Sequence, residues 1–378
     1  MTTANNPAIP DLLYSETENS LREALVDALD RSADWPATLA RTESDETVDV
    51  KLWQSLAVNM GLAGLPIADA EGGSDASWRE VAVVLEELGH HVAAVPFLGS
   101  AVTATALLQA VGETEMLGQL VAGESVAALA VRADSAPWSQ VGTDLGAKDD
   151  RLTGFVQSVT DAVHADWILA VAGEGLYAVA AQDVSIKPVV SLDMTRQLVD
   201  ITFDGAPGRL VASGSAVTAG VERALTISVA MLASEQLGIA ETCLTMTVEY
   251  LKERRQFGRV LGSYQALKHR LADLWVEITH ARAVARHAAG CAADGNEDLP
   301  IASSLANTIC AQVALKAAEE CVQMHGGIGF TWEHPAHLLL KRAKSASLMF
   351  GGPDEHRDWL GSLIGITMAD EEGTQANA

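Results

Sequence analysis

The chain has few cysteines, and no two of them stand at a metal-binding spacing. Its four cysteines lie far apart inside apolar helical patterns, and none belongs to a CxxC pair: Cys243, Cys291, Cys310 and Cys321. Zinc ribbons and disulfide-rich secreted domains need closely spaced cysteines, so both classes are excluded. We expect reduced, buried thiols and no metal site, because free cysteine is commonly a core residue.

Basic residues are also scarce. The chain has 25 lysines and arginines against 50 acidic residues, which gives a formal net charge of -25. Such a charge repels nucleic acid and anionic membrane surfaces, so neither is expected as a partner. The basic residues cluster between Lys252 and Arg286. A phosphate-bearing ligand, such as a nucleotide or a coenzyme A ester, is therefore expected to bind in that segment.

Two further absences narrow the class. No uninterrupted apolar run is long enough to cross a bilayer, and the first residues show no basic-then-apolar leader, so we expect a soluble, cytoplasmic protein. The chain has no Walker-type and no dinucleotide glycine fingerprint. A nicotinamide site of the Rossmann type is therefore not supported.

Apolar periodicity predicts an α+β protein with three domains. Apolar residues at helical spacing predict an N-terminal helical domain over residues 15–124, and their return after residue 215 predicts a C-terminal helical bundle over 215–368. Between them, residues 125–214 form short Val-, Ile- and Thr-rich segments between turn signals, the last at Gly205–Gly208, and predict a small β domain. Residues 369–378 are expected to be a disordered tail. Six strands are expected, near 127–131, 152–156, 167–171, 177–181, 186–190 and 198–203.

Two stretches carry an unusual density of chemical groups. The first, KERRQFGRVLGSYQ over 252–265, combines the forked donors of Arg254 with the ring of Phe257. The second, QMHGGIGF over 323–330, pairs Gln323 with a glycine turn. A ligand site is one interpretation. The alternatives are arginines that complement a helix dipole, a phenylalanine that plugs the core, and glycines that only cap a helix.

Taken together, these stretches resemble the acyl-CoA dehydrogenase family. The resemblance covers Thr17 to Leu363 and rests on the α–β–α order, on LPIADAEGGSD (65–75), and on the segments 253–274 and 323–344. It implies an FAD cofactor and α,β-desaturation of an acyl-CoA thioester. In that reaction a carboxylate removes the α-proton while a hydride leaves the β-carbon for the flavin.

The resemblance also implies which residues hold the cofactor. In the family, an Arg-x-Gln-Phe element, a later glutamine and a Gln-x-x-Gly-Gly turn reach across a subunit interface to the ADP part of the neighbouring subunit's FAD. Every matching position is kept in this chain: Arg254, Gln256, Phe257, Gln265, Gln323, Gly326 and Gly327.

The half of the family's site that holds the flavin within its own subunit is not recognisable. A Thr-Glu-Pro…Gly-Ser-Asp loop is replaced by ALAVRADSAPWSQ (128–140), the following Trp-x-Ser/Thr element is missing, and the β domain is shortened. The two family positions for the catalytic base hold Phe350 and Ser228, neither of which can abstract a proton. Glu235 is a substitute candidate, and its alternative role is a helix-interior carboxylate paired with an arginine.

These features predict a non-catalytic subunit of a heteromeric acyl-CoA dehydrogenase. A second family member would supply the base and most of the acyl-CoA site, with FAD shared across the interface of an α2β2 heterotetramer. The segment 351–357 resembles the smaller partner in actinobacterial dehydrogenases of steroid degradation, which suggests a steroid-derived CoA thioester. The alternatives are a self-sufficient homotetramer with Glu235 or Glu355 as base, and a flavin-free scaffold.

Overall fold

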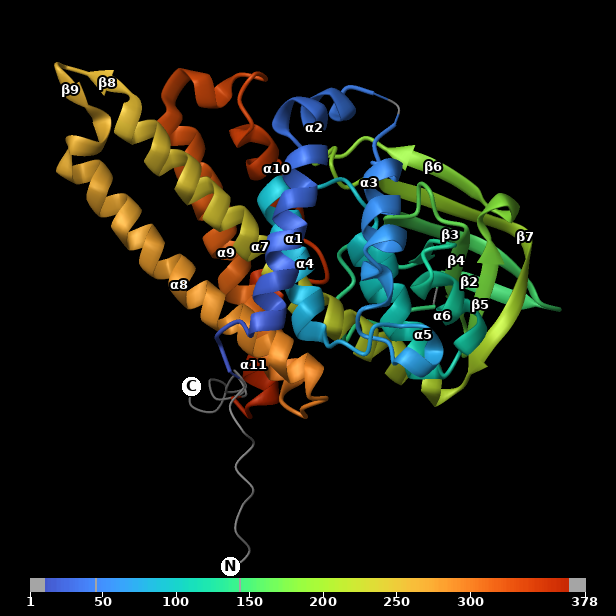
Figure 1. The fold of residues 1–378 in the computed structure, drawn as a ribbon. Coiled ribbons are helices and arrows are strands. Elements are labelled where there is room, and N and C mark those ends of the chain that lie inside the picture. The colour runs from blue at the N-terminus through green and yellow to red at the C-terminus, as the bar shows by residue number, and fades with distance from the viewer. Residues whose placement is uncertain (1–10, 45, 143, 367–378) are drawn as a thin grey trace, which may run out of the picture.

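A computed structural model of the chain describes residues 11–44, 46–142 and 144–366. It shows the predicted order of a helical domain, a sheet domain and a helical bundle (Figure 1). In this view the N-terminal helices lie between the bundle and the sheet. The predicted tail at 369–378 lies outside the described residues.

The N-terminal helices begin at local capping signals. Ser15 and Ser77 each form a capping box, with Glu18 and Glu80 respectively, which satisfies exposed backbone donors at the helix start. The predicted helix over 99–111 begins earlier, and its first part, Phe97–Ala104, is π-helical. The α-helices of this domain are α1 (Glu16–Ser32), α2 (Trp35–Thr42), α3 (Val50–Gln54), α4 (Trp78–His91), α5 (Thr105–Val111) and α6 (Thr114–Val121).

The middle domain is a seven-stranded sheet in the order β1-β4-β5-β7-β3-β2, with β6 paired to β7. Only β1 and β4 run parallel. Strand β2 was not predicted. The strands are β1 (Ala127–Leu129), β2 (Leu145–Lys148), β3 (Arg151–Thr160), β4 (Trp167–Ala172), β5 (Gly175–Ala180), β6 (Ser185–Val189) and β7 (Leu198–Ser213).

The predicted turn at Gly205–Gly208 was wrong. Strand β7 continues through it, pairing with β3 up to Pro207 and with β5 from Gly208 onward. Gly205 has a positive φ of 65° within this strand, a conformation that glycine adopts readily. The glycine-rich stretch is therefore the place where one long strand changes partners.

The C-terminal bundle is built around one very long helix, α7 (Ser215–Glu253). By length and a mean hydropathy of 1.4 it could cross a membrane, but 72% of its most apolar window is buried inside the protein. It is therefore a core helix. The other helices of this domain are α8 (Gln265–Ala293), α9 (Leu299–His325), α10 (Ala336–Ala346) and α11 (Pro353–Leu363).

Candidate functional site

The first dense stretch forms the tip of the bundle, where α7 ends and α8 begins (Figure 1). Arg254 is the C-cap of α7, and the chain then makes a short hairpin of β8 (Arg255–Gln256) and β9 (Arg259–Val260). Phe257 stands at the turn with a positive φ of 52° and is 90% exposed. An exposed ring does not plug a core, so that alternative for Phe257 was wrong.

The second dense stretch ends α9. Gln323 lies in the last turn of that helix, and Gly326 caps it with a φ of 63°. A Cβ added at Gly326 or Gly327 would meet no atom within 4 Å, whereas one at Gly329 would come 2.6 Å from the carbonyl oxygen of Val322. Packing therefore requires glycine at 329, while the space at 326 and 327 is open to a ligand.

Tyr250 and His325 hold the two stretches together. The Tyr250 ring stacks on the His325 ring with centroids 4.4 Å apart, and the Tyr250 hydroxyl donates to the His325 carbonyl at 3.3 Å. Tyr250 comes four residues before Arg254, and His325 directly precedes Gly326. This contact was not predicted, although both residues lie beside the dense stretches. It places the ends of α7 and α9 side by side.

All seven predicted cofactor residues are exposed at or near this end of the bundle: Arg254, Gln256, Phe257, Gln265, Gln323, Gly326 and Gly327. Within the described part of the chain, the Arg254 guanidinium makes no hydrogen bond or ion pair. Its donors are therefore available to an anion. Arg259 lies beside it in sequence with its guanidinium 3.7 Å from the centre of the Tyr264 ring.

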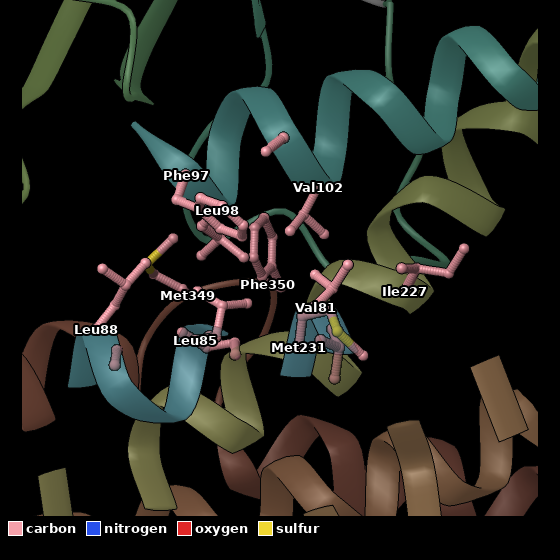
Figure 2. Packing of buried hydrophobic residues seen from close by; sticks show 14 of the residues in the cluster. Val81, Leu85, Leu88, Phe97, Leu98, Val102, Ile227, Met231, Met349 and Phe350 are labelled. Carbon is pink, nitrogen blue, oxygen red and sulfur yellow. The ribbon is translucent and has the colours of Figure 1, made fainter. Parts of the chain in front are cut away.

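The two base positions are sealed inside the core. Phe350 is 3% exposed, its N–H donates to the Ala133 carbonyl at 2.8 Å, and its ring packs among apolar side chains such as Leu98 and Val102 (Figure 2). The Ser228 hydroxyl is fully buried and donates to the Ala224 carbonyl at 2.8 Å. Neither side chain can act on a substrate in this arrangement.

Glu235 is buried between two arginines. Arg196 Nη2 lies 2.5 Å from its Oε2, and Arg342 Nε lies 2.8 Å from its Oε1. Burial alone would raise the pKa of this carboxyl, but the two arginine charges outweigh burial and lower the pKa from 4.5 to about 2. The geometry is that of the arginine-paired carboxylate given as the alternative. Such a group is too weakly basic and too enclosed to remove an α-proton.

The sheet-domain side does not fit a flavin ring. The stretch that replaces the family's loop and the segment before Phe350 enclose a cavity of about 270 Å³, whose lining residues include Arg132, Asp134 and Lys344 but no aromatic side chain. The middle domain's two tryptophans, Trp138 and Trp167, are both followed two residues later by residues other than Ser or Thr. The chain's residues thus fit the ADP part of FAD at the bundle end and do not fit the ring.

This fold and this bundle-end site define a class of flavin-dependent dehydrogenase with an α–β–α domain order. Sequence profiles of acyl-CoA dehydrogenases agree: the N-terminal domain profile matches residues 15–123, and the C-terminal domain profile matches residues 219–361. The chain belongs to the acyl-CoA dehydrogenase family, whose members are FAD-dependent oxidoreductases acting on a CH–CH bond of acyl-CoA.

Similar proteins include acyl-CoA dehydrogenase IpdE2 of Mycolicibacterium smegmatis, which is 34% identical over 342 residues, 90% of this chain and 96% of that protein. Among solved structures, the Tcur3481-Tcur3483 steroid dehydrogenase variant superimposes with a TM-score of 0.82 at 30% identity, over 93% of this chain and 98% of that chain. The ChsE4-ChsE5 complex from Mycobacterium tuberculosis gives a TM-score of 0.84 at 26% identity, over 95% of this chain and 100% of that chain.

Proposed function

We propose that this chain is the cofactor-clamping, base-lacking subunit of a heteromeric, cytoplasmic acyl-CoA dehydrogenase. The observation that carries the proposal is the contrast between the two halves of the site. The residues for the ADP part of FAD are complete and exposed at the bundle end, whereas Phe350 and Ser228 occupy the base positions inside the core. A chain of this kind contributes half of an active site and requires a partner for the other half.

FAD, when bound, supplies the hydride acceptor. Arg254 would neutralise phosphate charge in the ADP part, because a guanidinium forms strong charge-assisted hydrogen bonds to phosphate oxygens. Gln256, Gln265 and Gln323 would add amide contacts, and the open backbone at Gly326 and Gly327 would let the cofactor approach closely. The base and the cover of the flavin ring would come from the partner, together with most of the acyl-CoA site.

The similar structures support a heteromeric assembly. The ChsE4-ChsE5 structure is a complex by title, and the Tcur3481-Tcur3483 structure names two proteins and a steroid enzyme. We infer an α2β2 heterotetramer with one FAD per heterodimer, acting on a steroid-derived CoA thioester. The competing homotetramer would need Glu235 or Glu355 as base, but Glu235 is held by two arginines and Glu355 accepts the Gly352 N–H at 2.8 Å.

Flavin absorbance separates these functions. The chain is purified alone and, separately, after co-expression with a second acyl-CoA dehydrogenase subunit encoded beside it, and FAD content and dehydrogenase activity are measured for both. We expect flavin and activity only in the co-purified complex. A yellow, active protein from this chain alone would establish the homotetramer, and a stable complex without flavin would establish the scaffold.

Replacement of Arg254 by alanine tests the clamp directly. The complex should still assemble, but its affinity for FAD should fall by roughly 10- to 150-fold, because a hydrogen bond to a charged group is worth about 1.5–3 kcal/mol. Equilibrium dialysis of FAD measures the change. Arg31→Ala, which removes an exposed arginine from α1, should leave FAD affinity unchanged. An Arg254→Ala complex that binds FAD as the wild type does would remove Arg254 from the site.

A further inference from the structure

Three side chains at the contact between α4 and α7 form a second cluster, separate from the bundle end. They are Glu86 and His90 on α4 and Glu241 on α7, here called the acid-imidazole cluster. One oxygen or nitrogen atom from each lies within 4.8 Å of the other two. The residues are brought together from distant parts of the chain, and the function proposed above does not use them.

Neighbouring groups satisfy one oxygen of each carboxylate and leave the other free. The Tyr14 hydroxyl donates to Glu86 Oε2, and Arg282 donates from Nε and Nη2 to Glu241 Oε1 at 2.9 and 2.5 Å. Glu86 is only 2% exposed, yet its Oε1 has no hydrogen-bond partner among the described residues. Glu241 Oε2 instead faces His90 Nε2 at 3.3 Å.

The hydrogen bonds of Thr242 fix the tautomer of a neutral His90. The Thr242 hydroxyl donates its proton to the His90 carbonyl at 3.1 Å, and the same oxygen lies 2.8 Å from His90 Nδ1. Nδ1 must therefore carry the proton in that contact, because the hydroxyl proton is already used. The lone pair of a neutral Nε2 then points at a carboxylate oxygen. Two acceptors so placed repel each other unless a positive group lies between them.

A proton on Nε2 could bridge His90 and Glu241 but would leave Glu86 Oε1 without a partner. Arg22 does not supply that partner, because its Nη2 is 3.9 Å away and its Nε is paired with Glu87 at 2.5 Å. A metal ion can accept all three free atoms at once. The two carboxylates balance the charge of a divalent ion, and an imidazole ligand favours a transition metal over Ca²⁺ or Mg²⁺, which prefer oxygen ligands.

We propose that the acid-imidazole cluster binds a divalent transition-metal ion, with Zn²⁺ as the best match to one imidazole and two carboxylates. Zinc bonds of about 2.0–2.1 Å would draw the three side chains together by about 1 Å. A cavity of about 620 Å³ lined by Arg22, Glu87, His90 and Thr242 gives the ion a path from solvent and leaves room for a water ligand. The bound ion would join the N-terminal helical domain to the bundle.

Metal content of the full chain tests this proposal. Protein treated with EDTA is dialysed against micromolar Zn²⁺, and bound metal is measured by mass spectrometry. We expect one Zn²⁺ per chain and a higher midpoint of thermal unfolding with metal. Addition of Co²⁺ in place of Zn²⁺ should give visible absorption bands of a coordinated ion.

Two conservative variants and one control complete the test. Glu86→Gln keeps the size of the side chain and His90→Gln keeps a polar group, and each should weaken Zn²⁺ binding by more than about tenfold. Asp30→Asn removes an exposed carboxylate from the same cavity and should bind Zn²⁺ as the wild type does. Absence of stoichiometric Zn²⁺ in the wild type would overturn the proposal in favour of a protonated His90. Equal binding by all variants would also overturn it.

Discussion

Glu235 shows how a single buried charge is tolerated in this core. Its two arginine partners, Arg196 and Arg342, are themselves buried, and Asp193 lies 3.7 Å from Arg342. Two acids thus meet two arginines in a region without water, so the charges balance. Replacing one member would leave an unpaired charge in the core, which commonly costs 3–5 kcal/mol. The role of Glu235 in this arrangement is structural.

Glu235→Gln should lower the free energy of unfolding by about 3–5 kcal/mol at neutral pH. The folded-state pKa of about 2 lies below the unfolded value of 4.5. The contribution is therefore fully present above pH 4.5 and is lost as pH falls towards 2. Urea unfolding at pH 7, 5 and 3.5 should show a constant difference between wild type and variant down to pH 4.5 and a smaller one below it.

Glu23→Gln on α1 serves as the matched control. This carboxylate is exposed, so its replacement should change stability by no more than about 0.5 kcal/mol at any of these pH values. A Glu235→Gln difference that persists unchanged at pH 3.5 would contradict the low pKa.

At the scale of elements, the crossing of α4 and α7 organises the molecule. A Cβ at Gly238 on α7 would come 2.0 Å from the Glu86 carbonyl oxygen, and a Cβ at Gly89 on α4 would come 2.2 Å from the Glu235 carbonyl oxygen. The two helices therefore approach backbone to backbone, each through a glycine. The same crossing places both Glu235 and the acid-imidazole cluster at the contact between the first and third domains.

Gly238→Ala should separate α4 from α7 and destabilise the protein by about 1–3 kcal/mol, the usual cost of overpacking. Gly118→Ala in α6 is the matched control, because a Cβ there meets no atom within 4 Å and the glycine is helical. That change should be neutral or stabilising by up to about 1 kcal/mol. Denaturant midpoints compare the two variants, and equal stabilities would argue against the close crossing.

For the whole molecule, exposed aromatic side chains mark the face that a partner would cover. Phe257 is 90% exposed, Phe330 75%, Trp332 52% and Trp275 58%. Large exposed aromatics on the bundle end and on α8 are typical of a surface buried in an assembly. This surface includes the residues of the proposed cofactor clamp, so assembly and cofactor binding would be completed together.

Phe330→Ala should weaken association with the partner subunit. A central aromatic residue in an interface commonly contributes at least about 2 kcal/mol, which corresponds to roughly 30-fold in affinity. Val190→Ala is the control, since Val190 is fully exposed but belongs to the sheet domain. Sedimentation of mixed subunits over a concentration series measures both. Unchanged association of Phe330→Ala would place the interface elsewhere.

Much of this architecture follows from local sequence. Helices such as α6 and α7 could be predicted because apolar spacing and capping residues act over a few positions, and the family's linear motifs fixed the exposed clamp residues. The departures at Phe350 and Ser228 were also readable, because each motif defines its own position. Strand β2 and the continuation of β7 were missed, since pairing with distant strands outweighs local turn signals there.

Only the tertiary structure decided which buried groups meet. Glu235 lies 39 residues from Arg196 and 107 residues from Arg342, so no local pattern could show whether it was free or paired. The acid-imidazole cluster likewise joins α4 to α7, and sequence spacing predicted no metal site. Local sequence determines helices, caps and contiguous motifs, because those interactions span a few residues. Charge pairing and ligand geometry depend on packing between distant segments, and that packing exists only in the folded chain.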